Sequence, residues 1–312
     1  MIQISSIYEL QKIGNDPAYP LNGDYELTQD IDASKTVNWN GGAGFIPIGT
    51  SDNPFTGKFD GKGYKITGLY INRLDMSYIG LFGYIGSCSE VKNVCLENII
   101  IVGNYYVGGL VGVNSGTVTG YYSKGTILGE WYVGGLVGEN RNNVECCYSM
   151  GSVYGNGKIG GLSGENRGTV SGCYSTCSVY GKKEVGGLIG ENVGDVKNSF
   201  AMGAVIGSFI TGGLIGYLKS GSVTKTYSAG SVRGIVGNKG GLIGYIDTMF
   251  NNPTVTSSYW DTQTSGMTTS AGGKGKTTAE MKQQVTFNGW DFTNIWGMIE
   301  NNTYPYLRSI VK

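Results

Sequence analysis

A short glycine-rich segment returns along this chain at a nearly constant interval. Residues 107–112 read Val-Gly-Gly-Leu-Val-Gly, and the first glycine of each copy lies at 108, 134, 160, 186, 212 and 240. The interval is constant up to the copy at 212, and only the last interval is slightly longer. A fixed period in this range indicates stacked structural units, each of which buries its apolar face against its neighbours. The period constrains the fold more than any local propensity does.

Like residues recur at the same period between the glycine segments. Each copy holds about three short β-favouring runs, and glycine recurs too often for helices. We therefore predict an all-β fold, a right-handed parallel β-helix (solenoid) with coils of about 26 residues, about three strands per coil and a valine-lined interior. Corresponding residues would lie about 4.8 Å apart. The columns expected to stack as structural ladders are Asn114, Asn140, Asn166 and Asn192, and Tyr122, Tyr148, Tyr174, Phe200 and Tyr227.

Both ends of the chain depart from the period, and we predict that they are caps on one continuous domain. Residues 1–75 would form an N-terminal cap and the first coils, with a short helix opened by a capping box from Ser6 to Glu9. Residues 76–262 would form the repeat β-helix. Residues 263–312 would form a C-terminal capping segment, with a helix opened at Thr277 and an apolar tail closing the end as a lid. Such caps protect the unpaired backbone groups of the terminal strands.

Composition excludes several classes of function. Lys+Arg and Asp+Glu both number 23, which leaves no basic excess for nucleic-acid binding. Apolar runs fall short of the about 20 residues that span a bilayer, so we expect no direct membrane insertion. The chain contains no histidine, which excludes a histidine-based nucleophile site and a His-ligated zinc site. We therefore predict no cofactor and no metal.

The cysteines follow the repeat and match no zinc motif. Cys147 and Cys173 lie one period apart and should stack on neighbouring coils. Their expected spacing leaves a disulfide open, although a pair of buried thiols is favoured.

The repeated segment resembles a known family of repeats. Gly-Gly-Leu-Val-Gly-x-Asn, followed by Cys-Tyr-Ser at 147–149 and 173–175, is similar to the GLUG repeat. That repeat occurs in bacterial and archaeal surface proteins, in adhesin-like proteins and in the non-catalytic part of IgA-specific metallopeptidases. Segments 55–63 and 259–307 are similar to those that flank such repeats. The peptidase motif His-Glu-x-x-His is absent, so its activity is not implied.

The resemblance implies a non-catalytic, adhesin-like module of the extracellular space or cell surface. It would bind a glycan or a host or neighbouring-cell protein, or self-associate into a filament. The N-terminus lacks the basic and long apolar regions of a secretory signal, and on these family grounds we expect the numbering to begin after a removed signal.

Carboxylates keep a different function open, that of a polysaccharide-active β-helix enzyme (lyase or hydrolase). Glu139, Glu165 and Glu191 recur at the repeat period, with Arg141 and Arg167 beside the first two. We expect a solvated charge ladder on the surface, with a Ca²⁺ site or a glycan contact as alternatives. A catalytic pair would need carboxylates about 5–9.5 Å apart in a cleft.

Exposed aromatic residues are the candidate ligand contacts. Tyr154 and Tyr180 lie one period apart beside interior valines, so strand alternation places them outside. Tyr105, Trp131 and Tyr132 lie beside a turn in neighbouring copies. Flat exposed aromatics suit a sugar face or a protein partner, while lateral stacking that only stabilises the solenoid is the alternative.

Overall fold

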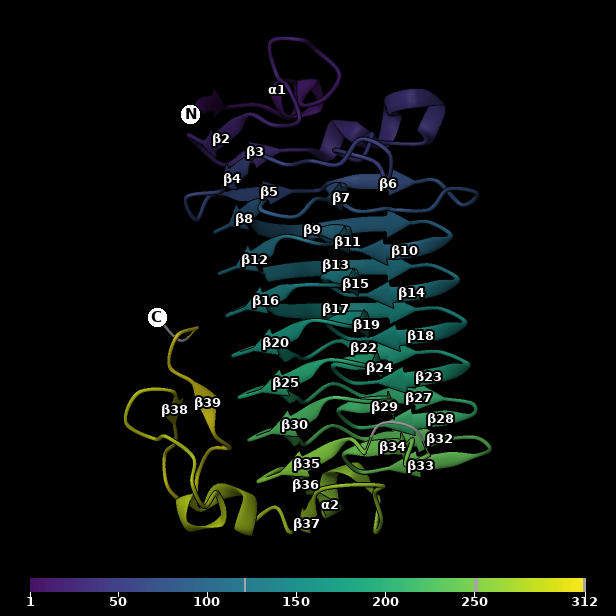
Figure 1. The fold of residues 1–312 in the computed structure, drawn as a ribbon, viewed down its shortest axis with the longest axis vertical. Helices are drawn as coiled ribbons and strands as arrows, with labels where there is room; N and C mark the ends of the chain where they lie inside the picture. Colours follow the sequence, from purple (N-terminus) through teal and green to yellow (C-terminus); the bar gives the residue numbers. More distant parts are fainter. Residues whose placement is uncertain (121, 250–251, 311–312) are drawn as a thin grey trace.

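The computed structural model describes residues 1–120, 122–249 and 252–310, and it is an elongated parallel β-solenoid (Figure 1). Its coils stack along the long axis, from the N-terminal cap to the end of the repeat. Val111 pairs with Val137, and Val137 pairs with Ser163, each partner lying one period further on. The predicted fold class and coil length are confirmed. Val311 and Lys312, the end of the predicted capping segment, lie outside the described residues.

One coil of the repeat contains four strands, so the prediction of about three strands per coil was wrong. The coil that begins at Tyr105 contains β10 (Tyr105–Gly108), β11 (Val111–Asn114), β12 (Thr117–Thr119) and β13 (Tyr122–Leu128). The glycine segment ends one strand at Gly108 and starts the next at Val111, with the bend between them.

The strands of successive coils align into four parallel sheets, described here for the residues that the structure covers. Sheet 1 contains β1 (Ile2–Ile4), β2 (Asp24–Leu27), β4 (Lys58–Asp60), β8 (Glu90–Lys92), β12, β16 (Asn143–Glu145), β20 (Thr169–Ser171), β25 (Asp195–Lys197), β30 (Ser222–Thr224) and β35 (Thr254–Thr256). Sheet 2 contains β10, β14 (Trp131–Gly134), β18 (Gly157–Gly160), β23 (Lys183–Gly186), β28 (Ile210–Gly212) and β33 (Asn238–Gly240).

Sheets 3 and 4 complete each coil. Sheet 3 contains β7 (Phe82–Ile85), β11, β15 (Val137–Asn140), β19 (Ser163–Asn166), β24 (Ile189–Asn192), β29 (Ile215–Leu218) and β34 (Ile243–Ile246). Sheet 4 contains β3 (Ile31–Asp32), β5 (Lys65–Thr67), β6 (Tyr70–Asn72), β9 (Cys95–Val102), β13, β17 (Tyr148–Tyr154), β21 (Tyr174–Ser175), β22 (Ser178–Tyr180), β26 (Phe200–Ala201), β27 (Val205–Gly207), β31 (Tyr227–Ser228), β32 (Val232–Gly234), β36 (Tyr259–Asp261) and β37 (Lys274–Lys276).

Aliphatic columns fill the interior, as predicted. Every member of the valine column in sheet 1 is fully buried; the column is Val118, Val144, Val170, Val196 and Val223. Glycine is required where sheet 2 turns toward sheet 3. A β-carbon at Gly108 would lie 2.2 Å from the carbonyl oxygen of Val111, which no side chain tolerates. Cys147 and Cys173 stack as buried thiols, and the Cys173 thiol donates to the carbonyl of Ser171 at 3.3 Å.

The asparagine column forms the predicted hydrogen-bonded ladder inside the bend after sheet 3. Each side-chain amide donates to the side-chain oxygen of the next asparagine at 2.7 to 2.8 Å. In the coil before the ladder, Ile85 occupies the position that pairs with Asn114. In the coil after it, Leu218 occupies the position that pairs with Asn192. The ladder therefore satisfies buried amides from coil to coil and ends where the column becomes aliphatic. Its four fully buried members are Asn114, Asn140, Asn166 and Asn192.

The aromatic column also stacks as predicted, on the outer face of sheet 4. Its rings are nearly parallel, with centroids 4.7 to 5.1 Å apart; the column is Tyr122, Tyr148, Tyr174, Phe200 and Tyr227.

The apolar tail does not close the C-terminal end as a lid, which corrects the sequence-based prediction. It folds back along the side of the solenoid, seen in yellow in Figure 1. Trp290 and Trp296 pack against Tyr227 of the aromatic column, with ring centroids 6.4 and 6.1 Å away. The Tyr227 hydroxyl donates to the carbonyl of Pro305 at 2.6 Å. The tail packs there because the rings of Phe200 and Tyr227 point outward from the solenoid. They are buried only because the tail covers them. Its two short strands, β38 (Trp296–Gly297) and β39 (Tyr306–Leu307), pair antiparallel.

Short helices form near both ends. At the N-terminus, α1 (Ile7–Lys12) is capped by Ser6, whose hydroxyl accepts from the amide of Glu9, while the Glu9 carboxylate accepts from Ser5. A 3₁₀ segment, η1 (Ser34–Gly42), follows in the cap. None of the helices in the described residues has the length and hydropathy of a membrane-spanning segment.

The C-terminal helix is shorter than predicted. Thr277 and Glu280 form the reciprocal capping bonds, at 2.8 and 3.2 Å. The extended backbone of Gln283 then interrupts the helix and leaves two 3₁₀ turns, η2 (Glu280–Lys282) and η3 (Gln284–Thr286). The α-helical turn is instead α2 (Thr262–Ser265), capped by Asp261.

We predict that Asn166→Leu lowers the free energy of unfolding by about 1–3 kcal/mol, because it leaves buried amide groups of the ladder unpaired. Asn192→Leu is the matched control. It breaks only one bond between ladder side chains, since the next coil already has Leu218, and should cost less. Urea unfolding followed by circular dichroism measures both. Equal midpoints for Asn166→Leu and the parent would show that the ladder is not structural.

Candidate binding surface

Tyr154 and Tyr180 lie on the outer face of sheet 4, as their alternation predicted. Tyr154 ends β17 and pairs in register with Tyr180, which ends β22. Their rings stack with centroids 4.9 Å apart and planes 7° apart. Tyr154 is 38% exposed, and Tyr180 is half-buried. The two ring faces that meet are covered by each other, so solvent reaches mainly the ring edges and hydroxyls.

These two tyrosines belong to a longer apolar column, which we name the corner strip. In-register pairing places its members on five successive coils, at the edge where sheet 4 turns toward sheet 2. The strip comprises Val102, Leu128, Tyr154, Tyr180 and Ile206, all half-buried or exposed. Sequence reasoning singled out only its aromatic members, although the same alternation applies to the aliphatic ones.

A shallow pocket of about 290 Å³ lies along the upper half of the corner strip. Leu74, which is 64% exposed, faces it from the N-terminal side. Glu130 and Asn156 line its polar edge, and the Asn156 amide donates to the Glu130 carboxylate. The surface is thus apolar along the strip and polar at the corner.

Tyr105 and Trp131 lie across the corner, on sheet 2. They pair in register, but no described ring contact joins them. The six-membered ring of Trp131 instead covers Gly157 of the next coil, where a β-carbon would lie 2.3 Å from the ring. The amino group of Lys183 lies 5.6 Å from the Trp131 ring centre.

Tyr132 faces a different side, so the five predicted contact residues do not form one site. Its ring stacks on Tyr106 at 4.6 Å, and the amino group of Lys158 lies 4.7 Å from its ring centre. Tyr106, Tyr132 and Lys158 share one column with left-handed backbone, with φ of 56°, 59° and 54°. Left-handed residues break the strand alternation. Because none of them is glycine or asparagine, no residue type in the sequence marked this break.

The glutamate column is buried, which corrects the prediction of a solvated surface ladder. Glu139, Glu165 and Glu191 stack in register on sheet 3, and Glu165 is 0% exposed. Lys158 reaches between coils from sheet 2, with its amino nitrogen 3.4 Å from Glu165 and 3.1 Å from Glu191. Arg167 lies 2.9 Å from Glu165 and 3.0 Å from Glu139. These cations neutralise a stack that would otherwise be repulsive.

Burial and neighbouring charges shift the pKa values of residues in and beside this network. Burial raises the pKa of the Glu165 carboxyl, although Lys158 opposes the shift, and burial also raises the pKa of Glu184. Burial alone would lower the pKa of Lys158, but Glu165 and Glu191 outweigh it and raise that pKa. Among the described residues, no group of three or more Asp, Glu or Cys side chains is placed to hold a metal ion. The Ca²⁺ alternative for the glutamate column therefore has no support.

Comparison with known proteins places the chain among β-solenoids without showing its family. No family model matches it. It is 38% identical over 130 residues to "Halomucin" of Haloquadratum walsbyi. The matched region covers 40% of this chain and 1% of that protein. It is 44% identical over 97 residues to a "Putative Gly-rich membrane protein" of Evansella cellulosilytica, covering 30% of this chain and 11% of that protein. The chain thus spans a small part of the relatives it matches.

Two solved structures share the fold. One is described as a "putative immunoglobulin A1 protease" from Bacteroides ovatus, with a TM-score of 0.60, 18% identity, and coverage of 98% of this chain and 92% of that chain. The other is an "IgA1 Protease", with a TM-score of 0.54 and 18% identity, covering 83% of this chain and 19% of that one. At this identity the likeness concerns the fold alone. The GLUG resemblance stays a prediction.

We predict that Glu165→Gln changes the pH dependence of stability. The folded-state pKa of Glu165 is raised, so the folded parent takes up this proton before the unfolded chain does. The contribution of Glu165 to stability therefore rises as the pH falls from 7 toward its ordinary pKa of 4.5, and glutamine lacks this contribution.

Urea unfolding of both proteins at several pH values between 7 and 5 measures the effect. The difference in free energy of unfolding, parent minus variant, should grow as the pH falls, while shifts at carboxyls outside this network cancel. Glu300→Gln, at an exposed site outside the network, controls for the loss of one charge. A difference that is constant or shrinks with falling pH would contradict the prediction.

Proposed function

We propose that this chain is a non-catalytic repeat module of a cell-surface or extracellular protein, and that it holds a protein partner along the corner strip. The observation that carries the proposal is an outward apolar column that continues over five coils. Apolar surface that persists in one line over several coils is typical of an interaction site.

The protein's own tail supports a polypeptide as the partner. On the same sheet 4, a second outward column of stacked rings is covered by Trp290 and Trp296 of the C-terminal tail. Stacked rings present edges, and aromatic side chains of a polypeptide pack well against such edges. A sugar instead prefers an open ring face, and Tyr154 and Tyr180 cover each other's inner faces. The corner strip therefore suits an apolar protein segment better than a glycan.

Charged residues beside the strip would set the orientation of the partner. Glu130 lies at its polar edge, and Lys182 and Lys183 are exposed two coils further on. A partner segment with an apolar centre and charges of both signs would match this arrangement.

A surface location is part of the same proposal. One relative is described as a membrane protein, and this chain spans 11% of its length. A repeat module carried within a much longer protein agrees with that coverage. The absence of histidine and the pairing of the buried glutamates with Lys158 and Arg167 support a non-catalytic role.

The test compares the parent with a Tyr154→Ala/Tyr180→Ala variant on arrays of extracellular proteins and of glycans, with a parallel screen for polysaccharide turnover. We expect protein binding by the parent and its loss in the variant. Tyr245→Ala is the control, because Tyr245 is equally exposed at 39% but lies on sheet 3.

Each other outcome contradicts a named part of the proposal. Turnover of any polysaccharide would establish the enzyme alternative. Glycan binding that is lost in the tyrosine variant, with no protein binding by the parent, would make a glycan the ligand of the corner strip. Protein binding that survives loss of both tyrosines would remove the corner strip from the site.

A further inference from the structure

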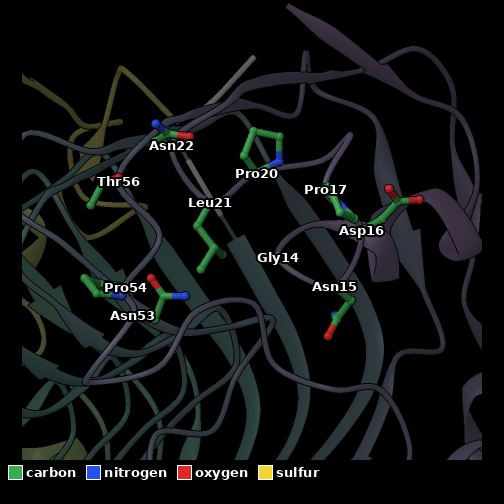
Figure 2. A pocket seen from close by; sticks show the side chains of 10 residues that line it. All are labelled: Gly14, Asn15, Asp16, Pro17, Pro20, Leu21, Asn22, Asn53, Pro54 and Thr56. Atoms are coloured by element: carbon green, nitrogen blue, oxygen red, sulfur yellow. The ribbon is translucent and has the colours of Figure 1, made fainter.

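The N-terminal cap has a separate surface cavity of about 580 Å³, wide open to solvent, between two loops that precede strands of sheet 1. One loop, residues 13–23, joins α1 to β2, and the other, residues 49–57, leads into β4. Figure 2 shows Leu21 between the loops, with Asn53 and Pro54 on one side and Asp16 and Pro17 on the other. The volume lies in the range of about 300–1,000 Å³ that is typical of small-molecule sites.

Backbone contacts hold the two loops in place. The amides of Thr56 and Gly57 both donate to the carbonyl of Leu21, at 2.9 and 3.2 Å. Gly14 has a left-handed φ of +79°, and a β-carbon there would lie 2.7 Å from Leu21. The amide of Gly14 also donates to the carbonyl of Tyr19 at 2.8 Å. The cavity is therefore formed before any ligand binds, which lowers the entropy cost of binding.

The lining combines apolar rings with unused amides. Leu21 and three proline rings, Pro17, Pro20 and Pro54, supply apolar surface. In the described part of the chain, the side-chain amides of Asn22 and Asn53 make no hydrogen bond, although each offers two donors and an acceptor. These amides are exposed, so their binding capacity is available to a ligand.

The charges at the cavity disfavour acidic ligands. Asp16 is the acidic residue of the lining, and one of its oxygens accepts from the amide of Ala18 at 2.9 Å. Its other oxygen lies 3.9 Å from the amino group of Lys12. No lysine or arginine among the described residues lines the cavity to hold a phosphate or carboxylate. A molecule with several hydroxyls and an apolar ring face matches both the amides and the proline and leucine surface.

We propose that this cavity binds a short neutral saccharide. Its hydroxyls would bond to the amides of Asn22 and Asn53 and to the Thr56 hydroxyl, while its apolar face would pack on Leu21 and Pro20. This site is distinct from the corner strip, both in place and in ligand, and neither proposal depends on the other.

The experiment uses the full chain, a panel of neutral and acidic oligosaccharides, and an Asn22→Ala/Asn53→Ala variant. The parent should bind neutral members, and the variant should bind about 10- to 100-fold more weakly, as expected for two lost hydrogen bonds. Saturation-transfer NMR measures the affinity, and shift changes in the parent should include Leu21. Asn302→Ala, an exposed asparagine near the other terminus, is the matched control.

The outcomes separate this proposal from the previous one. Tyr154→Ala/Tyr180→Ala should leave saccharide binding unchanged. Failure of the parent to bind any neutral saccharide, stronger binding of acidic ones, or unchanged affinity in the folded Asn22→Ala/Asn53→Ala variant would each overturn the saccharide site. Loss of binding in the tyrosine variant would place the saccharide on the corner strip instead. Equal unfolding midpoints of variant and parent establish that the variant is folded.

Discussion

Hydrogen bonding between parallel strands at a fixed separation of one period is the constraint on which the repeat part of this structure depends. Each residue of the repeat lies beside the residue one period further on. A residue type that recurs at the period therefore forms a column of identical side chains. Valines then pack on valines, and asparagines bond to asparagines. Tyrosine rings stack on tyrosine rings. Such columns are favourable because these side chains satisfy one another.

Stacking like charges in one column is unfavourable. In the glutamate column, lysine and arginine side chains offset the repulsion. Glu139, Glu165 and Glu191 would repel one another in a buried column. Lys158 enters from the neighbouring sheet, on a left-handed residue, and pairs with two of them. Removing such a cation leaves buried charges without partners. This costs more stability than replacing the whole ion pair with apolar residues. The repeat therefore depends on residues that are themselves not repeated.

The sequence predicted features that depend on the period and missed those that depend on contacts between sheets. The solenoid, the asparagine ladder and the stacked aromatic column follow from one-dimensional spacing. Arg167, one partner of Glu165, lies two residues further on and was visible from spacing. The other partner, Lys158, was not, because it lies on another sheet and its column is not lysine in the neighbouring coils. Tyr132 was grouped with Trp131 because both lie beside the same turn, and no residue type marked the left-handed φ of 59° at Tyr132. The tail was predicted as a lid because nothing in its composition specifies that it packs on the outward rings of sheet 4.

The most direct test of the account removes one coil. Deleting the segment 108–133 takes out one whole period and joins Val107 to Gly134, which restores the repeat at every column. The account predicts a folded, cooperative protein with β-type circular dichroism and one coil fewer. Deleting only the segment 108–120, half of a period, shifts every later column by half a coil and should abolish cooperative unfolding. Equal stability of the two deletions, or failure of only the whole-coil deletion, would contradict the claim that the fixed register holds this fold together.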